Sequence, residues 1–486
     1  MIKRLSGSAS SLWSLRRKSL STGKMAGMKP HTTQASWFFT APTDEVAVRR
    51  GDPLGLQAIA EDIAEKLAPG LSNRTMDARW ISLLCWCLRE GHSAWKAYGS
   101  GGKASGQASI AKELYPWIKP LELLWVARAI EVTQEAGRGR QLPGIRPIRK
   151  WIEQDRRPGQ FAFASSSYEQ YRFTGAYGGY RAPLRALDGL TEAGAGWLPA
   201  TQGLQLAEIV SAHVTSPAIY MRQRGPAPSP ENLWTRALEW KPSSSDFIPT
   251  LLNQPRQLDG DERAILRRAL FARRGNGDGQ KQSLRRLQVV EALARSGATD
   301  RTELMADLAT VLKAETDLAW LPHLASFSAL ADAGTTAMNA CWRAVSNAGD
   351  RVPNSTEVAS IPEVRNALAE LVKAARRWES KDSNTWAQRA GTLSQTMLAS
   401  PGDQPGTLRR LIRFHSQYGG GLKWVILDGD KIRPVARLRD GDASVYQYRL
   451  PALTRLARQC GVITGVPPLL QEQIEAAPAS TERIAA

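Results

Sequence analysis

Cysteine is scarce in this sequence, with 4 copies in 486 residues. Cys85 and Cys87 form a close pair on a predicted apolar helix, and Cys341 and Cys460 are distant singles. This arrangement matches neither a disulfide framework nor a zinc-binding spacing. A reducing cytoplasm is the simplest setting for such a chain, so we predict a cytoplasmic location.

Histidine is equally scarce. The five histidines are widely separated, at His31, His92, His213, His323 and His415. No two of them stand at the spacing of metal ligands, so the sequence predicts no histidine-based zinc site. We expect neither a bound metal nor a cofactor.

Long apolar runs are also missing, and so are acids near the start of the chain. No stretch approaches the roughly 18 apolar residues of a membrane span, so we expect no membrane partner.

Residues 1–30 carry seven Lys and Arg and no acid, a composition that fits a mitochondrial transit peptide. The alternative, which we favour, is an upstream extension of a chain that starts at Met25 or Met28. We expect residues 1–49 to be a disordered N-terminal extension.

Positive charge is in excess. The formal net charge is +18, and leaving out the 7 charges of residues 1–30 still leaves +11. Such an excess favours a polyanionic partner.

Apolar residues recur at helical spacing over most of the chain. Residues 50–135 read as a helical domain, in which one predicted helix places Trp80, Leu84, Cys87 and Leu88 on one face. Before that helix, Pro69-Gly70 breaks the chain, and Ser72, Asn73 or Thr75 can cap the helix that follows.

A second helical domain is predicted over residues 230–400. DGDERAILRRALFARR opens with an aspartate cap and an acidic first turn and ends with basic residues, the order that the helix dipole favours. In SLRRLQVVEALARSG, Ser283 is the expected cap and Gly297 the expected stop. Residues 136–164 are an Arg-rich linker or arm.

The C-terminal part changes character. WVILDGDKIRP predicts a hairpin with an Asp428-Gly429 turn, and YQYRLPALTRLARQ predicts a strand followed by a helix. We therefore expect a small α+β region over residues 405–470, followed by a tail over 471–486.

Residues 165–215 carry a distinctive pattern. A helix with an early Pro183 is followed by Gly189-Leu190, Gly196-Trp197, Pro199, Thr201, Gly203 and Leu206-Ala207. This order resembles the back half of a winged-helix domain. The resemblance implies a helix that lies in the DNA major groove and a hairpin that contacts phosphate.

On this interpretation, five residues of the module face nucleic acid, and the basic segment before it adds further contacts. Arginine suits phosphate contact and guanine recognition, and tyrosine suits phosphate contact. The alternative is that the module only packs or docks a protein partner. The candidate nucleic-acid-binding residues are Arg138, Arg140, Arg146, Arg149, Lys150, Arg172, Tyr177, Tyr180, Arg181 and Arg185.

Catalytic patterns are weak. Asp428, Asp430 and Lys431 are the residue types of a magnesium-dependent nuclease, but their spacing suits the tip of a hairpin better. His415 before Gly419–Gly421 is a further candidate, although a lone histidine there is more often a loop residue. GSGGKAS at 99–105 lacks both the first glycine of a phosphate-binding loop and the hydroxyl residue after its lysine.

The run PGLSNRTMDARWISLLCW at 69–86 resembles a stretch in a group of uncharacterised bacterial proteins encoded beside restriction and phage-defence genes. The matching residues are Pro69, Gly70, Ser72, Thr75, Ala78, Arg79 and Trp86. The resemblance implies a bacterial cytoplasmic protein that works with other subunits of a multi-gene defence system. It carries over no catalytic residues.

Together these patterns predict a mainly α, multi-domain protein with a winged-helix-like module in the middle. The predicted function is that of a non-enzymatic accessory subunit that binds double-stranded DNA and positions a partner effector during defence against foreign DNA. Two alternatives stay open: a magnesium-dependent nuclease with a C-terminal active site, and a helical protein–protein scaffold.

Overall fold

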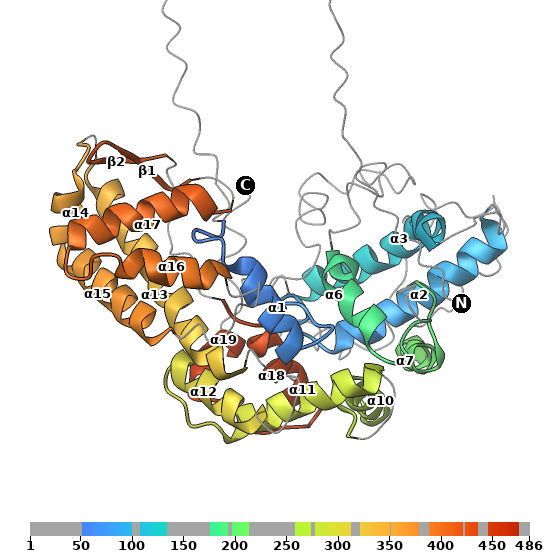
Figure 1. Ribbon diagram of the computed structural model, residues 1–486. Helices are drawn as coiled ribbons and strands as arrows, with labels where there is room; N and C mark the ends of the chain where they lie inside the picture. Colours follow the sequence, from blue (N-terminus) through green and yellow to red (C-terminus); the bar gives the residue numbers. More distant parts are fainter. Residues whose placement is uncertain are drawn as a thin grey trace, which may run out of the picture. The chain divides into compact units, whose positions relative to one another are not determined.

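The computed structural model describes residues 51–99, 107–133, 175–192, 197–212, 258–273, 278–312, 321–349, 351–378, 388–420, 423–435 and 446–475. These residues belong to a compact unit that spans Ala47–Ala486. Helices account for most of them (Figure 1), which confirms the prediction of a mainly α protein. The predicted extension at 1–49, the Arg-rich segment at 136–164 and the predicted tail beyond residue 475 lie outside the described residues.

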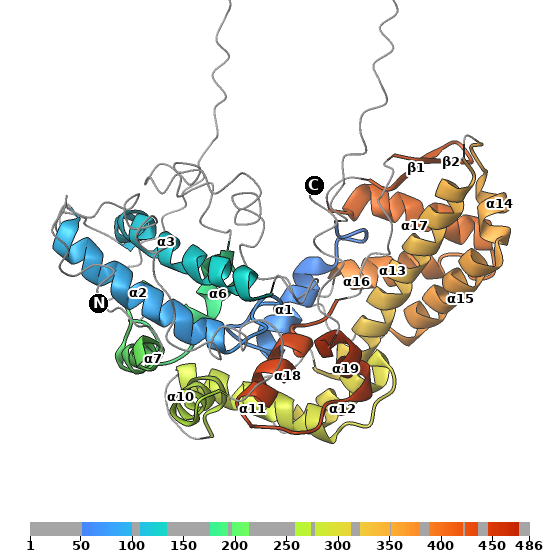
Figure 2. The same ribbon diagram turned by 180° about the vertical axis from the view of Figure 1, so that it is seen from behind.

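The first helices form where the apolar spacing predicts them. They are α1 (Gln57–Leu67), α2 (Arg79–Tyr98) and α3 (Gln107–Thr133). The predicted apolar face of α2 is buried, with Trp80 and Leu84 both almost inaccessible. α2 packs against α3, and the two helices lie side by side in both views (Figures 1 and 2).

The described part of the winged-helix-like segment contains two helices, α6 (Gly175–Ala186) and α7 (Thr201–Ala212). Thr191 and Pro199 form one antiparallel bridge between them. Pro183 lies inside α6 and not in its first turn, because the helix begins earlier than the sequence pattern predicted. Both helices pack against α2.

The next three helices are α10 (Gly260–Phe271), α11 (Asp278–Arg295) and α12 (Arg301–Leu312). The predicted cap of α10 is confirmed, since the Asp259 carboxylate accepts a hydrogen bond from the Asp261 N–H. The predicted cap of α11 is wrong. Ser283 lies inside that helix, and its hydroxyl donates to the Ala269 carbonyl at the end of α10.

A further helical group surrounds α13, which packs against α12, α14, α15 and α16. The elements are η4 (Leu321–His323), α13 (Leu324–Asn347), α14 (Ser355–Ser360), α15 (Pro362–Arg377), α16 (Gln388–Leu398) and α17 (Gln404–Tyr418). Asn354 and Glu357 form a capping box at the start of α14. None of the helices in the described ranges is long and apolar enough to cross a membrane.

The predicted hairpin is present as β1 (Val425–Asp428) and β2 (Lys431–Pro434). The strands are antiparallel, with Asp428 opposite Lys431, and Gly429 in the turn has a φ of +61°. Helices α18 (Leu450–Gln459) and α19 (Pro468–Glu475) follow.

The strand predicted just before α18 is wrong. Tyr448 and Arg449 instead adopt left-handed backbone conformations, with φ of 51° and 61°. Such conformations are costly for residues other than glycine and persist only where contacts hold them. The Tyr448 hydroxyl lies 2.9 Å from the Ser328 hydroxyl, and the Arg449 guanidinium bonds to Glu61 and Glu65 of α1. Side-chain contacts thus override the extended preference of this segment.

Candidate nucleic-acid interface

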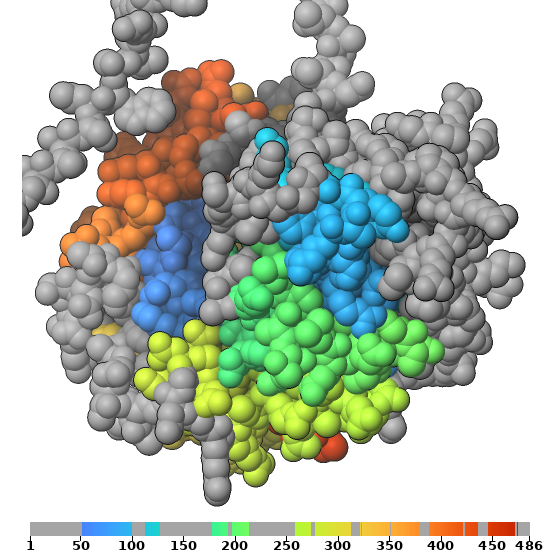
Figure 3. Space-filling model, turned by 90° about the vertical axis from the view of Figure 1, so that its right-hand side faces the viewer, coloured from blue at the N-terminus to red at the C-terminus, as the bar shows by residue number. Residues whose placement is uncertain are grey.

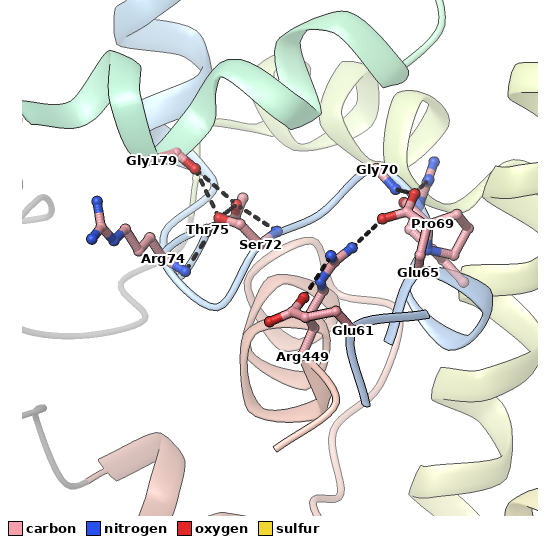
Figure 4. A network of polar contacts seen from close by, with 10 residues as sticks. Glu61, Glu65, Pro69, Gly70, Ser72, Arg74, Thr75, Gly179 and Arg449 are labelled. Atoms are coloured by element: carbon pink, nitrogen blue, oxygen red, sulfur yellow. Dashed lines mark hydrogen bonds and ion pairs between the residues drawn. The ribbon is translucent and has the colours of Figure 1, made fainter. Parts of the chain in front are cut away.

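The segment between α1 and α2, residues 69–79, carries the defence-family resemblance and contacts four distant helices. At its start, Gly70 has a φ of +70°, and its N–H donates to the Glu65 carboxylate at 2.8 Å. Glu65 also pairs with Arg449, as Figure 4 shows. A Cβ added to Gly70 would lie 2.4 Å from the Ala186 Cβ, so α6 packs directly on this turn.

The Pro69 carbonyl accepts a hydrogen bond at 2.7 Å from Arg286 of α11, a fully buried arginine. The same guanidinium donates to the Leu270 and Ala269 carbonyls at the end of α10. Desolvation lowers the pKa of Arg286 to about 9, and the charge of Glu65 opposes that shift. Arg286 therefore keeps its charge at neutral pH and satisfies carbonyls that α10 leaves without helical partners.

Ser72 and Thr75 act differently from the prediction. Neither caps α2, whose first turn follows Ala78 without a side-chain cap. The Ser72 hydroxyl instead donates to the Gly179 carbonyl of α6 at 2.8 Å, and the Thr75 hydroxyl lies 3.4 Å from the same oxygen (Figure 4). The two hydroxyls lie 2.9 Å apart. This pair fixes the position of α6 along the segment.

Asp77 makes the next connection. Its N–H donates to the Tyr180 hydroxyl of α6 at 2.9 Å, across 103 positions of sequence. Its carboxylate accepts from Arg455 and Gln459 of α18, each at 2.8 Å. Burial raises the pKa of Tyr180 well above its ordinary value, and the charge of Asp77 raises it further. Tyr180 thus stays a neutral hydroxyl that joins α6 to this segment.

Arg79 completes the segment by pairing with Glu262 of α10. Arg79 Nη2 lies 2.5 Å from Glu262 Oε2, and Nε lies 3.2 Å from Oε1. Both side chains are buried, with exposed fractions of 7% and 0%. A two-point pair of this kind satisfies both ions where water does not reach them.

The structure corrects the role of the two candidate tyrosines. Tyr177 is buried and stacks on Trp197, with ring centroids 4.3 Å apart, and Tyr180 is also buried. Neither side chain faces outward, so neither contacts a ligand from this surface. Both anchor α6 to the elements around it.

The outward face of α6 carries arginines separated by small residues. Gly178, Arg181, Ala182 and Arg185 follow one another at spacings of three, one and three residues, which places them on one side of the helix. Arg185 is exposed and Arg181 half-buried. Figure 3 shows the surface of α6 and α7 between that of α2 and that of α10.

Arg74 extends this face. It is exposed, and its Cβ lies 3.1 Å from the position that a Cβ on Gly179 would take. In Figure 4 its guanidinium points away from the hydrogen-bonded network. Within the described part of the chain, Arg74, Arg181 and Arg185 have no carboxylate partner. We call these three residues the α6 arginine face.

The candidates of the Arg-rich segment at 136–164 and one candidate of the winged-helix-like module lie outside the described residues. They are Arg138, Arg140, Arg146, Arg149, Lys150 and Arg172.

The hairpin acids are neutralised by arginines. Asp428 pairs with Arg433 at 2.9 Å, and Asp430 pairs with Arg409 at 3.0 Å. A hydrogen bond from Ser355 and the interaction with Arg409 lower the pKa of Asp430. In the ranges that the structure describes, no group of three or more His, Cys, Asp and Glu is placed to hold a metal ion.

His415 lies in the last turn of α17, and not in the loop that the glycine run suggested. Its Nδ1 lies 2.7 Å from the Pro53 carbonyl, and its Nε2 accepts from the Trp424 N–H at 2.9 Å. The neutral imidazole with a proton on Nδ1 fits both contacts. Burial lowers the pKa of His415, so this residue joins α17 to the hairpin as a neutral group.

Sequence reasoning missed the partners that hold the candidate interface. Each partner is a polar residue in a helix, and nothing in the sequence around it indicates a special role. The partners are Glu262, Arg286, Arg455 and Gln459. Only their contacts with residues 69–79 distinguish them.

Comparison of the chain with protein-family models, with curated proteins and with solved structures found no match.

Proposed function

We propose that this protein is a DNA-binding accessory subunit, and that the α6 arginine face binds the phosphate backbone of a duplex. The observation that carries this proposal is the set of three arginines, Arg74, Arg181 and Arg185, that lack carboxylate partners among the described residues. Unpaired surface arginines provide the charge that phosphate contacts use, and the net charge of +18 adds long-range attraction.

The face is also held rigidly. The Gly179 carbonyl, the Tyr180 hydroxyl and the Tyr177 ring are all engaged on the inner side of α6. A helix fixed at several points presents its charges in one geometry, so binding costs little conformational entropy. The tyrosines therefore support the interface from behind it.

The proposed setting is a bacterial system for defence against foreign DNA, in which this subunit positions a partner effector. The support is the resemblance at 69–86 together with the position of that segment. Ser72 and Thr75 hold α6, and Arg74 belongs to the α6 arginine face. The segment at 69–86 and the proposed DNA-binding face are thus in direct contact.

A salt titration of duplex binding tests the proposal. Each phosphate contact contributes about 0.9 to the slope of log K against log salt concentration. The variant R74Q/R181Q/R185Q should therefore bind more weakly, with a slope smaller by about 3. The matched control R365Q/R376Q/R377Q removes three exposed arginines of α15 that have no ion pair with any described residue, and it should match the wild type.

Two results would contradict the proposal. One is a full-length protein that fails to bind duplex even at low salt. The other is an α6 variant and an α15 variant with equal affinities and slopes.

The accessory role has a separate test. The purified full-length protein should retain duplex DNA without cutting it when Mg²⁺ is added. Cleavage by the pure protein, abolished by Asp428→Asn with Asp430→Asn, would replace this role with the nuclease alternative.

A further inference from the structure

A second group of arginines lies around the place where α10 packs against the end of α18. Gly461, which follows the C-cap residue Cys460 of α18, has a φ of +64°, and the Val462 N–H donates to the Ala457 carbonyl at 2.9 Å. This geometry is a Schellman motif. A Cβ on Gly461 would lie 3.6 Å from Arg263 Cδ, so the stem of Arg263 packs against this terminus.

Arg267 lies one turn after Arg263 on α10, on the same side of that helix. Burial raises the pKa of the Cys460 thiol, Glu262 raises it further, and Arg263 and Arg267 lower it. Both guanidinium groups therefore act electrostatically on the end of α18. Arg458 stands two residues before Cys460 and is exposed, as is Arg267. We call Arg263, Arg267 and Arg458 the α10–α18 arginine cluster.

Nearby acids do not balance this cluster. Glu262 is occupied by Arg79, and the Asp259 carboxylate caps α10. Asp261 is exposed and forms no ion pair with these arginines. In the part of the chain that the structure describes, Arg267 and Arg458 have no carboxylate partner, and Arg263 Nε is buried without a hydrogen-bond partner.

Like charges four residues apart on a helix repel, and the partial negative charge at the end of α18 offsets only part of three full charges. An anionic ligand would relieve this repulsion.

Hydrogen bonds connect the end of α18 to the segment that carries Arg74 of the α6 arginine face. Gln459, the neighbour of Arg458, bonds to Asp77 and to the Ala78 N–H, the latter at 2.7 Å. Arg74 is four residues before Ala78, so their Cα atoms are at most about 14 Å apart. One turn of duplex spans about 34 Å, so a single duplex is long enough to reach both groups. Figure 3 shows the surfaces of α6 and α10 on one face of the molecule.

We propose that the α10–α18 arginine cluster is a second backbone contact for the same duplex, which makes the interface bipartite. This inference rests on the proposed function, because it takes duplex DNA as the ligand. Guanidinium groups contributed by two helices contact phosphates without reading bases, so this contact strengthens binding equally for different DNA sequences.

The test compares R267Q/R458Q with the wild type across salt concentrations, on two duplexes of unrelated sequence. Arg263 is left intact because it packs against Gly461. We expect a slope smaller by about 2 on both duplexes, since two phosphate contacts are lost. R267K/R458K keeps the charge and should restore most of the slope. The matched control R376Q/R377Q removes two exposed arginines of α15 and should leave the slope unchanged.

The outcomes separate this inference from the proposed function. If R267Q/R458Q binds like the wild type while R74Q/R181Q/R185Q binds weakly, the second contact is wrong and the α6 arginine face stands. If only R267Q/R458Q binds weakly, the cluster stands and the α6 placement is wrong. A wild type that does not bind duplex overturns both. Equal thermal unfolding temperatures of all variants establish that the differences arise from binding.

Discussion

The α6 arginine face and the C-terminal hairpin both carry arginine at the surface, but within the described ranges only the arginines at the hairpin pair with acids there. On the hairpin, Asp428 and Asp430 each pair with an arginine at the surface. On α6, Arg181 and Arg185 have no acidic partner among the residues that the structure describes, whereas the ion pair Arg79–Glu262 that supports this region is buried. The hairpin surface is neutralised by its own ion pairs. The α6 surface keeps positive charge that a ligand can use, because the ion pair of that region is buried behind it.

The largest expected effect comes from breaking the buried pair. Glu262→Gln leaves Arg79 without a counter-charge, and loss of one partner of a buried pair costs about 3–5 kcal/mol. We expect the free energy of unfolding to fall by that amount in a denaturant titration. Asp428→Asn on the exposed hairpin is the matched control. Equal losses in both variants would contradict the distinction between the two regions.

The half-buried acid Asp332 sharpens the comparison, because its pKa shifts in the direction opposite to that of Asp430 on the hairpin. Asp332 of α13 pairs with Arg301 at 3.2 Å, but burial raises its pKa from 3.8 to about 6, against the lowering effect of Arg301. The folded protein therefore binds this proton more tightly than the unfolded chain does. Its contribution is fully present below about pH 3.8 and is lost as the pH rises through about 6.

The expected size of that contribution is about 3 kcal/mol, from a shift of about two pKa units. Asp332→Asn should remove this part of the pH dependence, measured as the free energy of unfolding between pH 4 and pH 8. Asp430 should behave oppositely, because its pKa is lowered and its contribution is lost as the pH falls. A wild-type and an Asp332→Asn curve that run parallel would contradict the assignment.

Removing the Tyr180 hydroxyl tests the support behind α6. Tyr180→Phe leaves the partly buried Asp77 N–H without its acceptor, and such an unsatisfied donor costs about 1–3 kcal/mol when it is fully buried. We expect a loss of stability up to that size, together with weaker duplex binding, because α6 loses one of its fixed points. Thermal unfolding and the salt titration measure the two effects. Unchanged values in both would show that Tyr180 does not anchor the helix.

The smallest effect is expected at the hairpin. Asp428→Asn removes an exposed pair with Arg433, and such pairs contribute about 0–1 kcal/mol. We expect a change within that range and no change in duplex affinity. A loss as large as that of Glu262→Gln would show that the hairpin is more than a surface turn.

Local patterns predicted much of the helical structure. The apolar face of α2, the Asp259 cap of α10 and the Asp428-Gly429 turn depend on residues within a few positions of one another, so the sequence suffices for them. Ser283 and Ser72 misled the prediction, because a serine that can cap a helix can also bond to a distant carbonyl. Whether the serine caps its own helix or bonds to a distant carbonyl depends on which element packs against it.

The sequence by itself determined the basic charge, the helical class and the hairpin, since these follow from composition and short-range periodicity. Only the tertiary structure decided that Tyr177 and Tyr180 are buried and that residues 69–79 hold α6. It also decided which arginines have acidic partners. The physical reason is that burial and pairing depend on contacts such as Asp77 to Tyr180, which span 103 positions of chain and leave no local pattern.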